Sequence, residues 1–347
     1  MIKLGIIGTG GMANSHAQNF ASNPNVKIIS ACDVIDKKVK EFAKEYNIPK
    51  TFTDIDDMLA DSELDAVSNV TPDALHSQVS LKVIESGKHI LCEKPLATNY
   101  PDAKKMADAA NAKGIINMVN FSYRNSSAIQ KAHEILNAGK IGRIMHVEAS
   151  YLQSWLSSKS WGDWKTETAW LWRLSKKHGS LGVLGDVGVH ILDFTSFPAG
   201  KIKSVNCKLK TFHKAKNDKI GEYELDANDS AVISVEFQNG AIGTIHTTRW
   251  ATGYPNSLAL RIFGDKGAIR IDLDKATDKL EMCRGKNIDK FQWETVECGK
   301  TPNIYERFIN SILTGKNDQP DFNRGAEIQK ILDACIESDE TTSTVEV

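Results

Sequence analysis

The chain has 347 residues, of which 41% are hydrophobic and 25% are charged, and its formal net charge is −1. This length favours two domains over one, and the composition is ordinary for a soluble globular protein. The balanced charge argues against a nucleic-acid-binding face, and no apolar run approaches the roughly 20 residues of a membrane span.

The six cysteines are scattered along the chain and form no C-x-x-C pair. This spacing argues against a disulfide framework and against a metal cluster. Several cysteines lie in apolar runs, where cysteine behaves as a small core residue. Residues 1–8 also lack the features of a signal peptide, so we expect a reducing cytoplasmic environment.

The first 120 residues alternate short apolar runs with amphipathic segments of helical length. We expect strands at 2–7, 26–32, 66–70, 89–92 and 115–119, and helices at about 12–22, 36–46, 73–86 and 99–113. Strands that are apolar on both faces and alternate with helices indicate a parallel sheet covered on both sides.

After about residue 122, longer strand-like segments follow one another through short turns. We expect strands at 143–153, 201–213, 229–237, 241–250, 256–263 and 268–273, and helices at about 126–138, 184–197, 303–314 and 322–337. Hairpin turns are indicated at Gln238-Asn239-Gly240 and at residues 264–267. Successive strands joined in this way predict an antiparallel sheet.

Residues 8–13 read Gly-Thr-Gly-Gly-Met-Ala, a G-x-G-x-x-A match between an expected strand and an expected helix. In such a loop Gly8 allows the tight turn, Gly10 lets the backbone approach a pyrophosphate, and Ala13 allows close packing of helix and strand. Asp33 ends the next strand, 20 residues beyond Ala13, where a ribose-binding acid is expected. The residues expected to contact a dinucleotide here are Gly8, Thr9, Gly10, Gly11, Met12 and Asp33.

Asp33 also favours NAD over NADP. Its carboxylate can accept hydrogen bonds from ribose hydroxyls, but it would repel a 2′-phosphate by roughly 4 kcal/mol per charge pair at about 4 Å and an effective dielectric near 20. Lys37 and Lys38 follow closely and could soften this repulsion, so NADP stays possible.

Two further places carry polar residues that suit chemistry. Glu93, Lys94 and Pro95 end the apolar run 89–92, at the edge where an open parallel sheet binds ligands. Asp186 and His190 are four residues apart, so they share one face of the expected helix. A metal site at this pair is disfavoured, because zinc usually takes three or four protein ligands.

Taken together, several motifs resemble the glucose–fructose oxidoreductase / inositol dehydrogenase / MocA family. They are the glycine loop, Thr71-Pro72 with His76, Glu93-Lys94-Pro95, Tyr123-Arg124, and Asp186 with His190. The resemblance spans essentially the whole chain. It implies an N-terminal Rossmann domain (residues 1–122) with a doubly wound parallel sheet, and a C-terminal α/β domain (residues 123–347) with an open, mostly antiparallel sheet.

The family resemblance also implies an activity, namely NAD(P)-dependent oxidation of a sugar or cyclitol hydroxyl, with Lys94, Asp186 and His190 as the catalytic set. Oxidation of an alcohol needs a base with a near-neutral pKa, and histidine meets that requirement. His190 would accept the hydroxyl proton, Lys94 would stabilise charge on the oxygen, and Asp186 would bind hydroxyls or orient the imidazole. The family habit further implies a cis Lys94–Pro95 bond and a homo-oligomer, a dimer or tetramer, paired through the open sheet.

Further contacts are expected from residues near these motifs. Thr71, Pro72, Glu93 and Lys94 are assigned to the cofactor. His76 either contacts the cofactor or caps a helix. The residues assigned to the substrate are Tyr123, Arg124, Trp172, Arg173, Asp186 and His190.

Five of the seven tryptophans, at positions 155, 161, 164, 170 and 172, lie within 18 residues. The segment has no clean period, which favours a loop lining a cleft, with a subunit interface as the alternative. Since no dense Arg/Lys cluster indicates a phosphorylated sugar, we expect a neutral sugar or cyclitol as substrate. The reaction is then oxidation of a secondary hydroxyl, or reduction of the matching keto-sugar. A redox-assisted glycosidase of the same fold and a non-catalytic NAD(P)-sensing protein stay open as alternatives.

Overall fold

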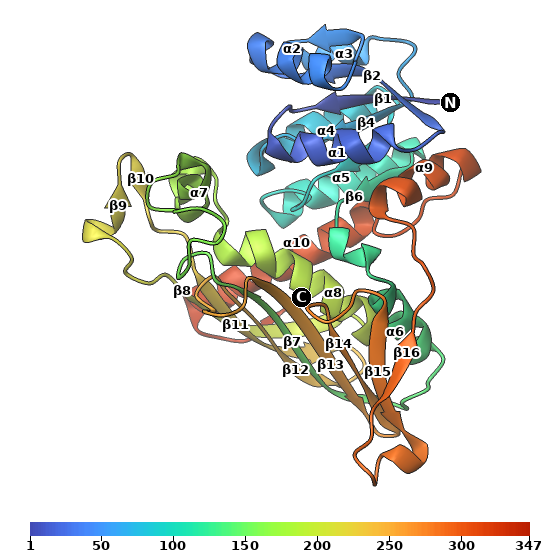
Figure 1. Ribbon diagram of the computed structural model, residues 1–347, viewed down its shortest axis with the longest axis vertical. Helices are drawn as coiled ribbons and strands as arrows, with labels where there is room; N and C mark the ends of the chain where they lie inside the picture. The colour runs from blue at the N-terminus through green and yellow to red at the C-terminus, as the bar shows by residue number, and fades with distance from the viewer. The chain divides into compact units, whose positions relative to one another are not determined.

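The computed structural model describes residues 1–347, except for the side chains of residues 168 and 169. The chain forms two compact units, shown in Figure 1. The first contains Met1–Ser122 and Pro302–Gln329, and the second contains Tyr123–Thr301 and Lys330–Val347. Residues 302–329, which the sequence analysis assigned to the second domain, therefore belong to the first unit.

The first unit is built on a six-stranded parallel sheet of order β3-β2-β1-β4-β5-β6. Its strands are β1 (Ile2–Ile7), β2 (Val26–Cys32), β3 (Lys50–Phe52), β4 (Ala66–Asn69), β5 (His89–Cys92) and β6 (Asn117–Val119). This order reverses between β1 and β4, which is the switch point where doubly wound sheets bind ligands. The predicted Rossmann sheet is confirmed, with β3 as a short strand that the sequence analysis did not predict.

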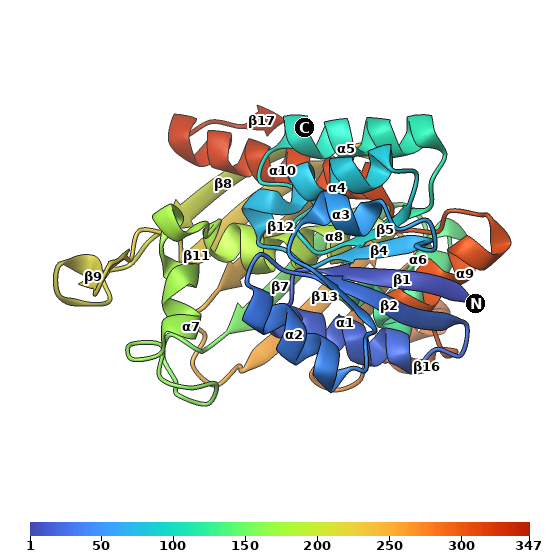
Figure 2. The same ribbon diagram turned by 90° about the horizontal axis from the view of Figure 1, so that it is seen from above.

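Helices cover both faces of this sheet (Figure 2). They are α1 (Gly11–Ala21), α2 (Asp36–Glu45), α3 (Ile55–Leu59), α4 (His76–Glu85), α5 (Tyr100–Lys113), α9 (Ile304–Thr314) and the beginning of α10 (Phe322–Thr341). Helix α9 joins this unit because its apolar side packs on α1: Tyr305 lies edge-to-face against Phe20 at 5.2 Å between ring centroids. Burial of this aromatic surface holds the distant segment 302–329 against the sheet.

The second unit is built on a nine-stranded sheet of order β16-β15-β14-β13-β7-β12-β11-β8-β17. Its strands are β7 (Ile144–Gln153), β8 (Ile202–Lys210), β11 (Ser230–Phe237), β12 (Ile242–Thr248), β13 (Asn256–Gly264), β14 (Gly267–Asp272), β15 (Lys279–Arg284), β16 (Glu294–Glu297) and β17 (Val345–Glu346). Neighbouring strands are antiparallel, apart from the parallel pair β7 and β12. The predicted mostly antiparallel sheet and both hairpin turns are confirmed.

One face of this sheet is covered by α6 (Ser127–Asn137) and α8 (Val189–Ala199), which pack on each other and on the strands. Along β7 the burial alternates with the period of a strand: Val147 and Ala149 are buried, whereas His146 and Glu148 reach the other face. The unit also contains a two-stranded hairpin of β9 (Lys219–Ile220) and β10 (Tyr223–Glu224), the short α7 (Thr168–Leu171) and the later part of α10 from Lys330 onward. The second sheet is therefore open on one side.

Candidate active site

The glycine loop is shaped by two different constraints. Gly8 has a φ of +89°, and a Cβ there would lie 2.5 Å from the carbonyl oxygen of Val70, so the loop needs glycine to pass the end of β4. A Cβ at Gly10 or Gly11 would meet nothing within 4 Å among the described residues. Helix α1 begins here, and the described side chains provide no cap for its first N–H groups. This exposed helix N-terminus with open space above it fits a pyrophosphate.

Asp33 is oriented by the loop itself. Its Oδ2 accepts hydrogen bonds from the backbone N–H and the hydroxyl of Thr9, at 2.9 and 2.8 Å, and its Oδ1 accepts the N–H of Ile35 at 3.0 Å. Burial alone would raise the pKa of Asp33, but these hydrogen bonds outweigh it and lower the pKa. The carboxylate is therefore ionised and fixed at the end of β2, as a ribose-binding acid requires.

Four exposed apolar side chains follow the carboxyl ends of β1, β2 and β4 in the sequence. They are Met12, Val34, Ile35 and Leu75, with Val34 the most exposed at 84%. The carboxyl ends of the strands are where an open parallel sheet binds ligands. Of these the sequence analysis singled out only Met12, because exposure cannot be read from an apolar residue type.

The turn after β4 is tied to the loop after β5. Asn69 Oδ1 accepts both the N–H and the hydroxyl of Thr71, at 3.2 and 2.7 Å. The buried ring of His76 lies between two backbone carbonyl oxygens, with Nδ1 2.7 Å from Pro95 O and Nε2 2.8 Å from Thr71 O. His76 thus connects two loops expected to contact the cofactor, and Pro72 lies in the first of them.

Glu93 is buried beneath the same edge of the sheet. Its Oε1 accepts hydrogen bonds from His16 of α1 at 2.7 Å and from Asn120 at 2.5 Å. Lys94 is half-buried, and its peptide bond to Pro95 is cis, as the resemblance implies. His16 and Asn120 were missed in the sequence analysis. The available signal was a histidine within the otherwise apolar buried stripe of α1.

In the second unit, Asp186 lies in a π-helical turn, Leu184–Gly188, that runs directly into α8. His190 is in the first turn of α8 and is 8% exposed. The sequence analysis expected one regular helix across both residues. The wider π turn is a local irregularity of a kind frequently found at functional sites, and it changes the angular relation of the two side chains.

Arg249, at the end of β12, anchors Asp186. Its buried guanidinium donates from Nη2 to Asp186 Oδ2 at 3.0 Å and from Nη1 to the carbonyl oxygen of Arg173 at 3.0 Å. The same guanidinium lies 5.0 Å from the ring centroid of Trp155. The sequence analysis did not identify Arg249, which connects Asp186 to the predicted substrate residue Arg173.

Tyr123 belongs to a hydrogen-bonded group beside His190. Its ring lies edge-on to the imidazole, with 5.0 Å between centroids, and its hydroxyl is bonded to the Tyr151 hydroxyl. Asn256 completes the group by accepting from Tyr151 at 2.9 Å and donating to Tyr123 at 3.1 Å. These hydroxyl and amide groups are suited to binding the hydroxyls of a polyol.

Arg124, predicted as a substrate contact, is instead buried within the second unit. Its side chain is 1% exposed and forms a bidentate ion pair with Asp193 at 2.6 and 2.7 Å. The guanidinium also lies 3.5 Å from the ring centroid of Phe197. This geometry indicates a structural role, because the Nε and Nη2 groups of Arg124 both donate hydrogen bonds to Asp193.

The tryptophan-rich segment forms a small core of its own. Trp155 and Trp164 are buried in it, and Trp161 and Trp170 pack against it beside the β9–β10 hairpin. Trp172 is half-buried, and the Arg173 guanidinium lies 4.5 Å from its ring centroid. Most of the cluster is therefore explained by packing, and Trp172 and Arg173 remain the members that we expect to meet substrate.

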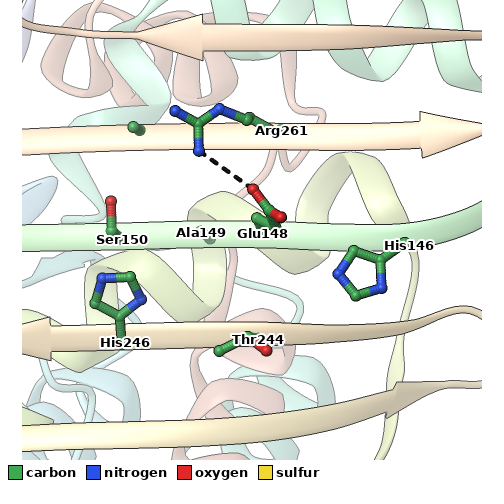
Figure 3. A pocket seen from close by; sticks show the side chains of 8 residues that line it. His146, Glu148, Ala149, Ser150, Thr244, His246 and Arg261 are labelled. Carbon is green, nitrogen blue, oxygen red and sulfur yellow. Dashed lines mark hydrogen bonds and ion pairs between the residues drawn. The ribbon is translucent and has the colours of Figure 1, made fainter.

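A depression of about 240 Å³ lies on the open face of the second sheet (Figure 3). It is lined by His146, Glu148, Ala149, Ser150, Thr244, His246, Ala259 and Arg261. It contains none of the predicted catalytic residues.

Within the described residues, no three His, Cys, Asp or Glu side chains form a group that could hold a metal ion. None of the helices in the described part of the chain combines the length and apolar character that a membrane crossing requires.

Comparisons with known proteins agree with this architecture. A family model described as "Oxidoreductase family, NAD-binding Rossmann fold" matches residues 2–121, and one described as "GFO/IDH/MocA C-terminal domain" matches residues 129–270. Levoglucosan dehydrogenase of Pseudarthrobacter phenanthrenivorans is 27% identical over 100% of this chain and 98% of its own length. D-glucoside 3-dehydrogenase of Escherichia coli is 27% identical over 100% of this chain and 97% of its own length.

A solved structure of levoglucosan dehydrogenase in complex with NADH and levoglucosan is similar to this chain with a TM-score of 0.89. The two chains are 27% identical, and the match covers 100% of this chain and 99% of the other. Together with the glycine loop, the parallel sheet and the open second sheet, these matches show that the chain belongs to the GFO/IDH/MocA family of NAD-binding oxidoreductases.

Proposed function

We propose that this protein is an NAD-dependent dehydrogenase that oxidises a secondary hydroxyl of a neutral sugar or cyclitol, or reduces the matching keto-sugar. The observation that carries the proposal is the arrangement in the second unit, where Arg249 anchors the Asp186 carboxylate one π-helical turn before the His190 imidazole. The names of two relatives, which are dehydrogenases of levoglucosan and of D-glucosides, support the substrate class.

In the proposed mechanism each side chain has one task. When bound, NAD supplies the hydride acceptor. His190 accepts the proton of the reacting hydroxyl, a role worth about 10²–10⁴-fold in rate. The Lys94 ammonium donates a hydrogen bond to the same oxygen and stabilises its developing negative charge. Asp186, held by Arg249, accepts a hydrogen bond from a neighbouring substrate hydroxyl.

The test is a spectrophotometric assay with NAD and a panel of levoglucosan, D-glucosides, free sugars and inositols. We expect the reduced-nicotinamide absorbance to grow with at least one of them. His190→Ala and Lys94→Ala should each lower turnover by about 10²-fold or more while NAD affinity changes little. His213→Ala, at an exposed loop histidine of the second unit, is the control and should keep full activity.

Failure to turn over any sugar, cyclitol or keto-sugar would overturn the proposal. Release of the leaving group from an aryl glycoside, without net formation of NADH, would instead identify the redox-assisted glycosidase. Loss of NAD binding in the two variants would reassign Lys94 and His190 to the cofactor site.

We also propose that two copies pair through the open face of the second sheet. Val232 and Ile242 are each more than half exposed there. On the neighbouring strands, Val232 lies opposite His246 and Ile242 lies opposite His146, and both histidines line the depression. Ile242→Glu should lower the mass measured by light scattering, whereas a monomeric wild type would refute the proposal.

Six free thiols, four of them buried, favour a reducing cytoplasm as the compartment.

A further inference from the structure

A buried polar network in the first unit joins the helix of the glycine loop to the strand end that carries Lys94. His16 is fully buried, with Nε2 2.7 Å from Glu93 Oε1 and Nδ1 2.7 Å from Ser68 Oγ. Asn120 donates to the same Glu93 oxygen. The second carboxylate oxygen, Oε2, accepts the backbone N–H of Lys94 at 3.2 Å. One carboxylate therefore connects His16 to the Lys94 backbone.

The ionised state of Glu93 is what distinguishes this network from an ordinary packing contact. Burial alone would raise the pKa of Glu93, but hydrogen bonds from His16 and Asn120 and the charges of His16 and Lys94 lower it to about 2. A buried charge is costly unless it is paired and hydrogen-bonded, and the Glu93 carboxylate meets this condition through His16, Asn120 and the backbone N–H of Lys94. These partners hold the ionised carboxylate in one orientation directly beside Lys94.

We propose that His16 is a positioning residue that acts on Lys94 through Glu93. The imidazole fixes the orientation of the carboxylate, and the carboxylate fixes the backbone N–H from which the Lys94 side chain extends. The catalytic part of this inference rests on the function proposed above for Lys94. The structural part, that His16 restrains Lys94, stands separately and is measured without any substrate.

The substrate-free test follows amide exchange of Lys94 by NMR in protein labelled with ¹⁵N-lysine. His16→Phe fills the ring volume but removes the donor to Glu93, whereas His16→Gln keeps a side-chain N–H. We expect exchange at Lys94 to accelerate about tenfold or more in His16→Phe and to stay near wild type in His16→Gln, as loss and retention of a charge-assisted hydrogen bond imply. Equal exchange in all three proteins would overturn the proposal. If His16→Phe does not fold, Asn120→Ala removes the other donor and takes its place with the same expected acceleration.

The activity test separates positioning from stability. At saturating NAD and sugar, His16→Phe should lower kcat about tenfold with NAD affinity nearly unchanged, and His16→Gln should recover most of it. Asn117→Ala removes another buried polar side chain of this unit, which accepts the N–H of Phe322, and should lower the melting temperature without lowering kcat. A kcat unchanged in His16→Phe, or lowered equally in His16→Gln, overturns the catalytic part. A wild type that turns over no sugar, cyclitol or keto-sugar refutes the proposed function, whereas the exchange rates still decide whether His16 restrains Lys94.

Discussion

Replacing Arg124 by methionine tests whether this residue is structural or binds substrate. The side chains of Arg124 and Asp193 are 1% and 3% exposed, and two short hydrogen bonds join them. Arg124→Met keeps much of the apolar volume but deprives a buried carboxylate of its bidentate partner, which costs about 3–5 kcal/mol. For a unit of this size that loss corresponds to a fall of roughly 10 °C in melting temperature.

Tryptophan fluorescence provides a selective assay, because all seven tryptophans lie between positions 155 and 293 and so within the second unit. Urea unfolding followed in this way should show an earlier midpoint for Arg124→Met. Adding Asp193→Leu should recover most of the lost stability, since it removes the buried charge. Arg143→Met breaks an exposed pair with Asp265 and, as the control, should cost less than about 1 kcal/mol.

Two outcomes are mutually exclusive for this variant. A lower unfolding midpoint with restored stability in the double variant supports the structural role. An unchanged midpoint combined with a raised KM for the sugar would refute the burial argument and favour the substrate contact that the sequence predicts. The same urea curves of the control show whether loss of any arginine destabilises this unit.

Three further predictions concern the first unit. Gly8→Ala should lower stability by about 1–3 kcal/mol through its positive φ and the contact with Val70 O, whereas Gly10→Ala should leave the melting temperature unchanged yet weaken NAD binding about tenfold or more. Asp33→Ala should weaken NAD binding about tenfold and NADP binding less, as measured by fluorescence titration; equal losses would contradict its ribose role. The pKa of Glu93 lies below its ordinary 4.5, at about 2. The stability advantage of wild type over Glu93→Gln should therefore be full above about pH 4.5 and shrink as the pH falls toward 2, and an advantage that is constant down to pH 2 would contradict this.

Local patterns account for the elements that the sequence predicted. The alternation of apolar runs and amphipathic helices before residue 122 is a short-range property, and so are the turns at Gly240 and Gly267, which both have positive φ in the structure. The strands β15 and β16 were missed because charged residues interrupt their apolar pattern. Helix α9 was predicted, but its place in the first unit depends on aromatic packing with α1, nearly 300 residues away.

The difference between short-range patterns and long-range contacts also explains which residues of the candidate site could be predicted from the sequence. A residue that follows a strand is easily identified as a candidate, but its sequence position does not say whether the side chain turns toward a ligand or into the protein. Arg124 directly follows Tyr123, yet only Tyr123 lies against His190, because the Arg124 guanidinium turns inward to Asp193. Conversely, His16 is 77 positions from Glu93, and Arg249 is 63 positions from Asp186. These two residues reach the site only through long-range contacts, so the sequence could place the first groups of the site but not the residues that hold them in position.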